Sequence, residues 1–166
     1  MYLRTLEMSL KQKTIVTGVI GSDTHIVGNR ILSMALEKAN FKVIALGALT
    51  PATDFIKAAI ETNADAIMVS SLYGQGELDC RGFRDLCMEA GLDEILLYVG
   101  GNLVVGKRPW SEVEKTFLDM GFDRAAAPGT RIETVMGWLE QDFAARDQQM
   151  RRVVDAQSDV LDSREC

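Results

Sequence analysis

The one histidine of the chain, His25, lies in the segment 21–28, directly after an apolar run that predicts a buried strand. Asp23 precedes the imidazole by two residues and can hold one ring nitrogen by a hydrogen bond, which would fix the tautomer. The other ring nitrogen is then available to a metal ion. The carboxyl end of a parallel strand is also where α/β proteins bind ligands. A lone histidine is only weak evidence for a metal site. Whether His25 is a ligand therefore has to be judged from the other residues at the predicted strand ends.

Two further segments of small and polar residues follow apolar runs. Ser70-Ser71-Leu72 ends one predicted strand and Gly100-Gly101 ends another. Taken singly, each motif has a simpler explanation: Asp23 as a helix N-cap, Ser70 as a strand end and the two glycines as a turn. Their joint occurrence at the ends of three predicted strands favours a common site.

Short β-branched apolar runs alternate with amphipathic segments, which predicts strands alternating with helices. The expected strands are 14–20, 42–46, 66–70, 94–99 and, weakly, 124–127; the expected helices are 28–39, 50–62, 78–90, 111–120 and one that begins near residue 130. In the first helix the spacing of Ile31, Leu32, Ala35 and Leu36 predicts the buried face. The fold class is α/β: a flavodoxin-like (Rossmann-like) five-stranded parallel sheet, order 2-1-3-4-5, with helices on both faces. That order places the ends of strands one, three and four around the point where it reverses.

Composition and charge limit the possible functions. The 166 residues, 47% hydrophobic and 25% charged, fit one globular domain. The net charge of −6 argues against a nucleic-acid or anionic-membrane partner. Without a bilayer-length apolar run or a signal-peptide pattern, the chain is expected in the cytoplasm. We expect a domain over residues 13–141 with terminal extensions 1–12 and 142–166, the latter a frayed helix extension or disorder.

The three cysteines, Cys80, Cys87 and Cys166, lack CxxC spacing and are expected to be free thiols. The first two lie seven residues apart, which predicts that they share one face of a helix and pack in or near the core.

The three segments together resemble the signature of cobalamin-binding domains in which a histidine replaces the cofactor's own base: DxHxxG, SxL and GG. The 41 residues between Gly28 and Ser70, and the 27 between Leu72 and Gly100, agree with the family's separations. The resemblance implies that His25 is the axial ligand of cobalt and that Asp23 is its partner, and it assigns both a catalytic role.

The same resemblance implies a slot for the displaced nucleotide tail. Gly100 and Gly101 would admit a flat base, Ser70 would offer a hydroxyl, and Leu72 would line the wall. A bulky residue at Gly101 is therefore expected to block the slot without unfolding the domain. The full set of expected cofactor-binding residues is Ser22, Asp23, Thr24, His25, Ile26, Gly28, Ser70, Ser71, Leu72, Tyr73, Gly74, Gly100, Gly101, Asn102, Leu103, Val104, Gly129 and Thr130.

From about Lys13 to Glu140 the chain is similar to the small subunits of glutamate mutase (methylaspartate mutase component S). The similarity is carried by TIVTGVIGSDTHIVGNRIL, FIKAAIETNADAIMVSSLYGQGELDC and LLYVGGNLVVGK. It implies an adenosylcobalamin-dependent isomerase that interconverts L-glutamate and threo-3-methylaspartate, beginning with homolysis of the cobalt–carbon bond. It also implies a large subunit that carries the substrate barrel, in a heterotetramer of two small and two large subunits.

Other proteins of this fold provide alternatives. Methyl-transfer corrinoid proteins usually have a helical cap ahead of the cobalamin domain, and only 13 residues precede the first predicted strand. A cobalamin carrier or sensor would need an effector domain, for which a tail of about 25 residues is too short. Flavin-binding and phosphoacceptor proteins of this fold agree less well. The first strand ends in neither a hydroxyl-rich phosphate loop nor an acidic pair.

Overall fold

The computed structural model describes residues 11–162, with side chains to residue 157, and the chain divides into two compact units. Gln12–Ile132 is the larger unit and contains the sheet. The other contains the segment from Glu133 onward, which forms helix α7 (Ile132–Asp162). Within residues 11–162, no helix combines the length and the apolar character that a membrane span requires.

One parallel sheet is built from β1 (Thr14–Val19), β2 (Lys42–Ala45), β3 (Ala66–Ser71), β4 (Leu96–Gly101) and β5 (Arg124–Ala125). Its order is β2-β1-β3-β4-β5, which confirms the predicted topology. β1 is buried at every residue, as its continuous apolar run requires.

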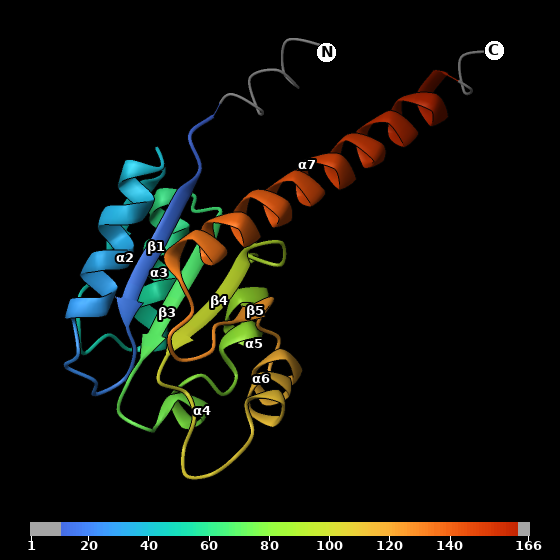
Figure 1. Cartoon of the computed structure of the whole chain (residues 1–166). Helices are drawn as coiled ribbons and strands as arrows, with labels where there is room; N and C mark the ends of the chain where they lie inside the picture. The colour runs from blue at the N-terminus through green and yellow to red at the C-terminus, as the bar shows by residue number, and fades with distance from the viewer. Residues whose placement is uncertain (1–10, 163–166) are drawn as a thin grey trace. The chain divides into compact units, whose positions relative to one another are not determined.

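The sheet brings the ends of its three central strands to one edge. The arrowheads of β1, β3 and β4 point to the same end, near the short helix α4 (Gly76–Asp79) (Figure 1). In the register, Val19 pairs with Ser70, and Ser70 pairs with Gly100. The three segments singled out in the sequence are therefore neighbours at this edge.

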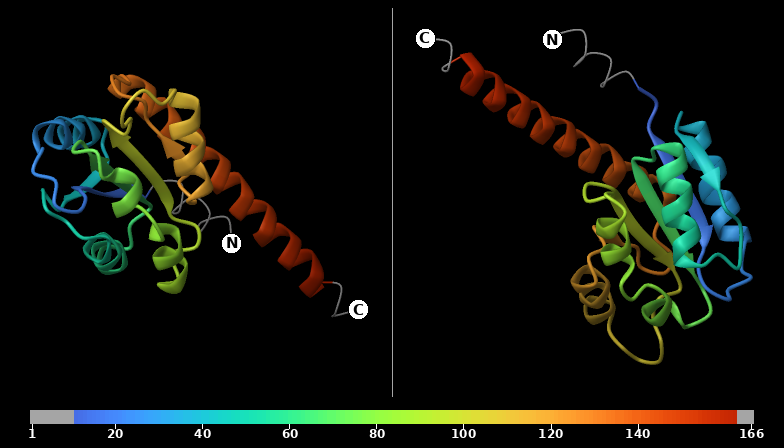
Figure 2. Two further views of the ribbon diagram at one scale, coloured as in Figure 1. Left: turned by 90° about the horizontal axis from the view of Figure 1, so that it is seen from below. Right: turned by 180° about the vertical axis from the view of Figure 1, so that it is seen from behind.

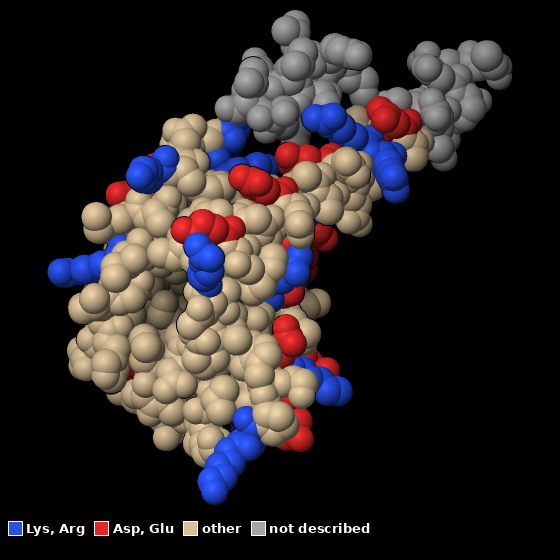
Figure 3. Space-filling view, viewed as in Figure 1, with Lys and Arg blue, Asp and Glu red and all other residues tan. Residues whose placement is uncertain are grey.

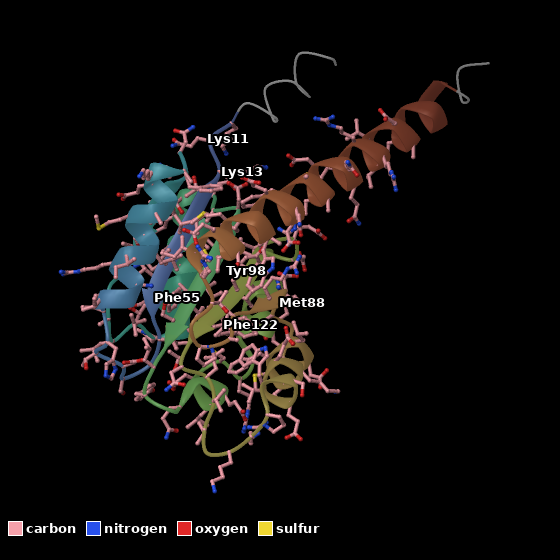
Figure 4. The ribbon with its side chains drawn as sticks, in the orientation of Figure 1. Lys11, Lys13, Phe55, Met88, Tyr98 and Phe122 are labelled. Carbon is pink, nitrogen blue, oxygen red and sulfur yellow. The ribbon has the colours of Figure 1, made fainter. Side chains whose placement is uncertain are left out.

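Helices α3 (Ala52–Thr62), α5 (Phe83–Glu89) and α6 (Trp110–Asp119) contribute to a core on one face of the sheet. The view from behind shows α3 over this face (Figure 2). The rings of Phe55 and Phe83 lie 5.7 Å apart, those of Phe83 and Phe122 6.0 Å, and those of Phe122 and Phe117 5.9 Å. Phe55 and Phe122, labelled in Figure 4, thus belong to one chain of aromatic contacts.

Helix α2 (Val27–Lys38) packs on the opposite face, and the prediction of its buried side is wrong for Ile31. Ile31 is 52% exposed, whereas Asn29, Ser33 and Leu36 are buried. The reason is the strand surface beneath the helix, which offers hydroxyl groups. Ser33 Oγ lies 2.9 Å from Thr17 Oγ1, and Asn29 donates to Ser70 Oγ at 3.1 Å. Leu36 is buried as predicted, so hydrogen bonding at Asn29 and Ser33 and apolar burial at Leu36 together define the inward face.

The single helix expected over 78–90 is two helices, α4 and α5, separated by a turn in which Gly82 has a φ of 76°. The prediction that Cys80 and Cys87 share a helical face is therefore wrong, because Cys80 lies outside α5. Their predicted burial is confirmed, since both are fully buried free thiols. Burial raises the pKa of Cys80 to about 12 and that of Cys87 to about 11.

The C-terminal extension is helical: α7 continues through residue 142 to Asp162. Of the two alternatives expected for that extension, its described part agrees with the helix extension and not with disorder. The last four residues, Cys166 among them, and residues 1–10 lie outside the described residues.

Candidate cofactor site

The imidazole of His25 is exposed and is anchored by a buried carboxylate. Nδ1 lies 2.6 Å from Asp23 Oδ1, and the same oxygen accepts the His25 backbone N–H at 2.9 Å. The Asp23 side chain is wholly buried, whereas that of His25 is 61% exposed. Because an ionised carboxylate can only accept, the ring hydrogen belongs on Nδ1. Nε2 then carries a free lone pair on an exposed ring.

Asp23 also joins the β1–α2 loop to the β3–α4 loop. Its second oxygen, Oδ2, accepts the backbone N–H of Leu72 at 2.5 Å. Burial by itself would raise the pKa of Asp23, but hydrogen bonds from His25 and Leu72 outweigh burial and leave this pKa below its ordinary value. The carboxyl group is therefore ionised at neutral pH.

The serines at the end of β3 have different surroundings. Ser70 accepts a hydrogen bond from Asn29, which leaves its own hydroxyl hydrogen free to donate. Ser71 Oγ is buried and has no hydrogen-bond partner among the described residues. A buried hydroxyl without a partner is uncommon in folded proteins. It lies on the core side of β3, next to Gly76 and Leu103.

The two glycines at the end of β4 differ in what they require. A Cβ at Gly101, where φ is 114°, would collide with the carbonyl oxygen of Ser71 in the paired strand. A Cβ at Gly100 would lie 3.3 Å from that of Ala126. Gly100 alternates with the core residue Val99, so it faces the α2 side of the sheet. The expectation that a bulky residue at Gly101 would leave the fold intact is therefore corrected: sheet geometry requires glycine at that position.

The remaining predicted residues gather at the same edge. Gly28 lies in the first turn of α2, where an added Cβ would meet no atom within 4 Å, so there is open space beside it. Thr130 closes the turn after β5, with its backbone N–H and Oγ1 both donating to the carbonyl oxygen of Ala127. Ser22, Thr24 and Ile26 lie in the His25 loop, Tyr73 and Gly74 in the β3–α4 loop, Asn102 and Val104 in the loop after β4, and Gly129 beside Thr130.

Leu103 differs from the other predicted residues. Its side chain is only 3% exposed and belongs to the hydrophobic core.

Sequence reasoning missed Asn29 and Asp79. The signal for Asn29 is a polar residue among apolar ones at the start of α2, one residue after the DxHxxG pattern. Asp79 had no such signal. Its hydrogen bond with Tyr73 depends on how α4 turns back toward the His25 loop.

The surface around His25 is apolar. Val27, Leu49, Leu78 and Val105 are each at least half exposed. On the face shown in Figure 3, charged side chains are sparse over the lower left of the molecule, the side on which the β1–α2 loop lies in Figure 1. Such a surface suits the broad face of a large cofactor or of a protein partner.

The residues present fit a metal that arrives with its other ligands. His25 offers one nitrogen, which is what a cobalt ion held by a corrin ring needs from a protein at its lower axial position. Among residues 11–162, no cluster of three or more His, Cys, Asp or Glu side chains could hold a metal ion. The hydroxyl of Ser70, which accepts from Asn29 and keeps its hydrogen to donate, is consistent with a polar ligand group on the α2 side of this edge.

Comparisons with known proteins agree with this chemistry. The model of the B12 binding domain matches residues 13–131. The chain is 61% identical over 134 residues to the glutamate mutase sigma subunit of Clostridium tetani, covering 81% of this chain and 98% of the relative. It is 48% identical over 146 residues to that of Escherichia coli O157:H7, covering 88% and 98%.

Solved structures confirm the fold. A cobalamin-binding protein from Desulfitobacterium hafniense aligns with a TM-score of 0.66 at 20% identity, over 80% of this chain and 59% of that one. The receiver domain of the response regulator NarL from Mycobacterium tuberculosis aligns with a TM-score of 0.54 at 12% identity, over 80% and 97%. At these identities the likeness is one of fold alone, so the assignment depends on the sequence relatives. The chain belongs to the B12-binding domain family and, within it, to the glutamate mutase sigma subunits.

Proposed function

We propose that this chain, as the cobalamin-binding subunit of glutamate mutase, holds adenosylcobalamin through coordination of cobalt by His25 Nε2. The observation that carries this proposal is the 2.6 Å contact between an exposed imidazole and the buried carboxylate of Asp23. When bound, adenosylcobalamin supplies the radical chemistry that interconverts L-glutamate and threo-3-methylaspartate. The chain supplies ligation and orientation.

Asp23 orients the imidazole of His25. Its negative charge accepts the Nδ1 hydrogen, which increases the donor strength of Nε2 and fixes the ring orientation. Two backbone N–H groups, from His25 and Leu72, hold the carboxylate in place. The ligand is thus set before the cofactor arrives.

The nucleotide tail is assigned to the α2 side of the sheet. Ser70 donates its hydroxyl hydrogen to the base, and Gly100 leaves the strand end open to a flat ring. Support comes from the free donor on Ser70 and from the position of Gly100 beside it in the sheet. The other residues that we assign to cofactor binding are Ser22, Thr24, Ile26, Gly28, Ser71, Leu72, Tyr73, Gly74, Gly101, Asn102, Val104, Gly129 and Thr130. Leu103 is left out because its side chain lies in the core.

The substrate barrel belongs to a partner catalytic subunit. We assign the complex two small and two large subunits, place it in the cytoplasm, and give the cobalamin-binding domain the bounds 13–141. The family match over residues 13–131 supports these bounds, and the free thiols of Cys80 and Cys87 support a reducing compartment.

Electron paramagnetic resonance of bound cob(II)alamin tests the ligation. Since the sequence contains one histidine, growth on ¹⁵N-histidine labels His25 alone in a tag-free chain. We expect the three-line nitrogen splitting of the unlabelled complex to become two lines with the label. In His25→Ala the two-line splitting should be absent, and any three-line splitting that remains comes from the cofactor's own base. A splitting that the label leaves unchanged would refute coordination by His25.

A further inference from the structure

The side chains of Tyr73 and Asp79 form a hydrogen-bonded pair against the loop that carries His25. The Tyr73 hydroxyl donates to Asp79 Oδ2 and accepts the backbone N–H of Ser22 at 3.2 Å. Both side chains are half-buried. Ser22 directly precedes Asp23, so the pair touches the loop next to the residue that anchors the imidazole.

The direction of these hydrogen bonds follows from the chemistry of the groups. A carboxylate can only accept, so the hydrogen of the Tyr73 hydroxyl is committed to Asp79. A lone pair of the phenol oxygen then faces the Ser22 N–H. Asp79 therefore determines which way the Tyr73 hydroxyl points. Among the described residues, the hydrogen bond to the loop itself is made by Tyr73 and not by Asp79.

The loop backbone also packs closely on the pair. Gly21 has a φ of 71°, and a Cβ at this position would collide with the Asp79 carboxylate and the Tyr73 hydroxyl. On its other side the loop is held through Gly21 N, which donates to the carbonyl oxygen of Thr50 at 2.9 Å. A displacement of either member of the pair would therefore be transmitted to the loop.

Helix α4 gives the pair a firm support. Cys80, which follows Asp79, is fully buried in the core. Glu77 on the same helix forms an ion pair with Arg108 from the loop after β4. Groups that hold a functional side chain act best when they are themselves fixed by packing.

We propose that Tyr73 and Asp79 are positioning residues for the axial histidine: Asp79 orients Tyr73, and Tyr73 fixes the backbone of the His25 loop. With the bond from Leu72 N to Asp23, the loop is held to the β3–α4 segment at two points. The inference rests on the proposed coordination by His25.

Tyr73→Phe, Asp79→Ala and the double variant test this inference in the complex with an unlabelled large subunit. We measure the dissociation constant for cob(II)alamin and the fraction of bound cofactor that shows ¹⁵N coupling from labelled His25. Partners of metal ligands typically affect affinity about 10–100-fold. We expect each single variant to bind about tenfold more weakly and to lose part of the coupling. The double variant should be no worse than either single one, because the two residues act as a unit.

Two further variants separate positioning from general stability. Asp79→Asn retains an acceptor for the Tyr73 hydroxyl and should recover most of the coupled fraction. Asp119→Asn removes a carboxylate from the exposed pair with Lys115 and should change neither measurement. If circular dichroism shows that Tyr73→Phe does not fold, the comparison of Asp79→Ala with Asp79→Asn tests the positioning role.

Three results would overturn the positioning role: single variants that bind like the wild type with full coupling, losses that multiply in the double variant, or an equal loss in Asp119→Asn. Weaker binding with full coupling would also contradict it, since the loss would then concern corrin contact and not the histidine. Absence of ¹⁵N coupling in the wild type refutes the axial ligation itself, which distinguishes failure of the proposed function from failure of this inference.

Discussion

At the scale of single residues, the site depends on a contrast in exposure between two neighbours. The carboxylate of Asp23 is wholly buried and the ring of His25 is 61% exposed, although one residue separates them. A buried charge is costly unless hydrogen bonds compensate it. Asp23 obtains that compensation from its own loop and from Leu72. The imidazole is therefore presented to the surface, while the carboxylate that orients it is kept away from water.

Replacing Asp23 by Asn should weaken cobalamin binding by about 10–100-fold, because a neutral amide neither fixes the tautomer nor polarises the ring as a carboxylate does. Spectrophotometric titration of the reconstituted complex measures this change. Asp119→Asn is the control for the loss of a carboxylate in general, and it should bind cobalamin with the affinity of the wild type. Equal affinity of Asp23→Asn and the wild type would argue against the assigned partnership.

The same variant should change how stability depends on pH. The folded-state pKa of Asp23 is lowered, so its ionised form stabilises the fold above the unfolded pKa of about 4. That contribution is lost as the pH falls through the folded pKa. The difference in unfolding free energy between the wild type and Asp23→Asn should therefore shrink between neutral pH and about pH 3. Urea unfolding at a series of pH values measures it, and a difference that grows on acidification would contradict the assignment.

The two glycines of β4 should respond differently to substitution. Gly100→Leu should lose affinity for cobalamin, because Gly100 faces the side assigned to the nucleotide tail. Since a Cβ there would lie 3.3 Å from that of Ala126, circular dichroism must first show that the variant folds. Its affinity for cobinamide, which lacks that tail, should remain that of the wild type. Gly101→Ala should lower the melting temperature, since its Cβ meets the Ser71 carbonyl group. Normal cobalamin binding by Gly100→Leu would show that the nucleotide tail does not lie beside Gly100.

At the scale of elements, the sequence predicted strands better than helix faces. Burial of β1 on both sides leaves a run of apolar and small residues, so this strand could be predicted directly. The sheet order followed from the alternation of strands and helices. The inward face of α2 could not, because Asn29 and Ser33 meet hydroxyls of β3 and β1 that only the folded sheet brings beneath them. The break before α5 was missed for a similar reason: Gly82 at φ 76° interrupts a pattern that otherwise reads as helical.

The candidate site was likewise predictable only in part: the sequence identified some of its residues and missed others. His25, Asp23 and Ser70 carry their chemistry in their residue types, and their spacing placed them at strand ends. Nothing in the sequence marks Asp79 as a site residue, because the role that we propose for it depends on a tertiary contact with Tyr73. Leu103 entered the site by its neighbourhood alone, and its side chain lies in the core.

The two polar contacts beneath α2 allow a matched comparison. Asn29→Ala and Ser33→Ala each remove one hydrogen bond from this face and should each lower the free energy of unfolding by about 0.5–1.5 kcal/mol. Only Asn29→Ala should also weaken cobalamin binding, because Asn29 orients the hydroxyl of Ser70 and Ser33 contacts Thr17. Denaturant unfolding and cobalamin titration on both variants test this. Equal losses of affinity would mean that α2 acts through its stability alone.

At the scale of the whole molecule, the proposed ligand faces outward and its surroundings are apolar. Val27, Leu49, Leu78 and Val105 expose half or more of their surface near the edge that carries His25. A corrin on this edge would cover part of that area and leave its own upper face uncovered by the residues described above. Radical chemistry needs a site from which water is excluded. On the proposed ligation, we expect the cofactor site to be complete only when a partner subunit covers it.

The isolated chain should accordingly bind adenosylcobalamin weakly and show no mutase turnover. Adding the large subunit should tighten cofactor binding, and by thermodynamic linkage the cofactor should tighten subunit association by the same factor, about 5- to 150-fold for typical coupling energies. Titrations of each ligand in the presence and absence of the other measure both factors. In the reconstituted complex, His25→Ala should abolish turnover while its circular dichroism stays that of the wild type, because its side chain is largely exposed. Mutase turnover by the chain alone, or a cofactor affinity that the large subunit leaves unchanged, would contradict a cofactor held between the two subunits.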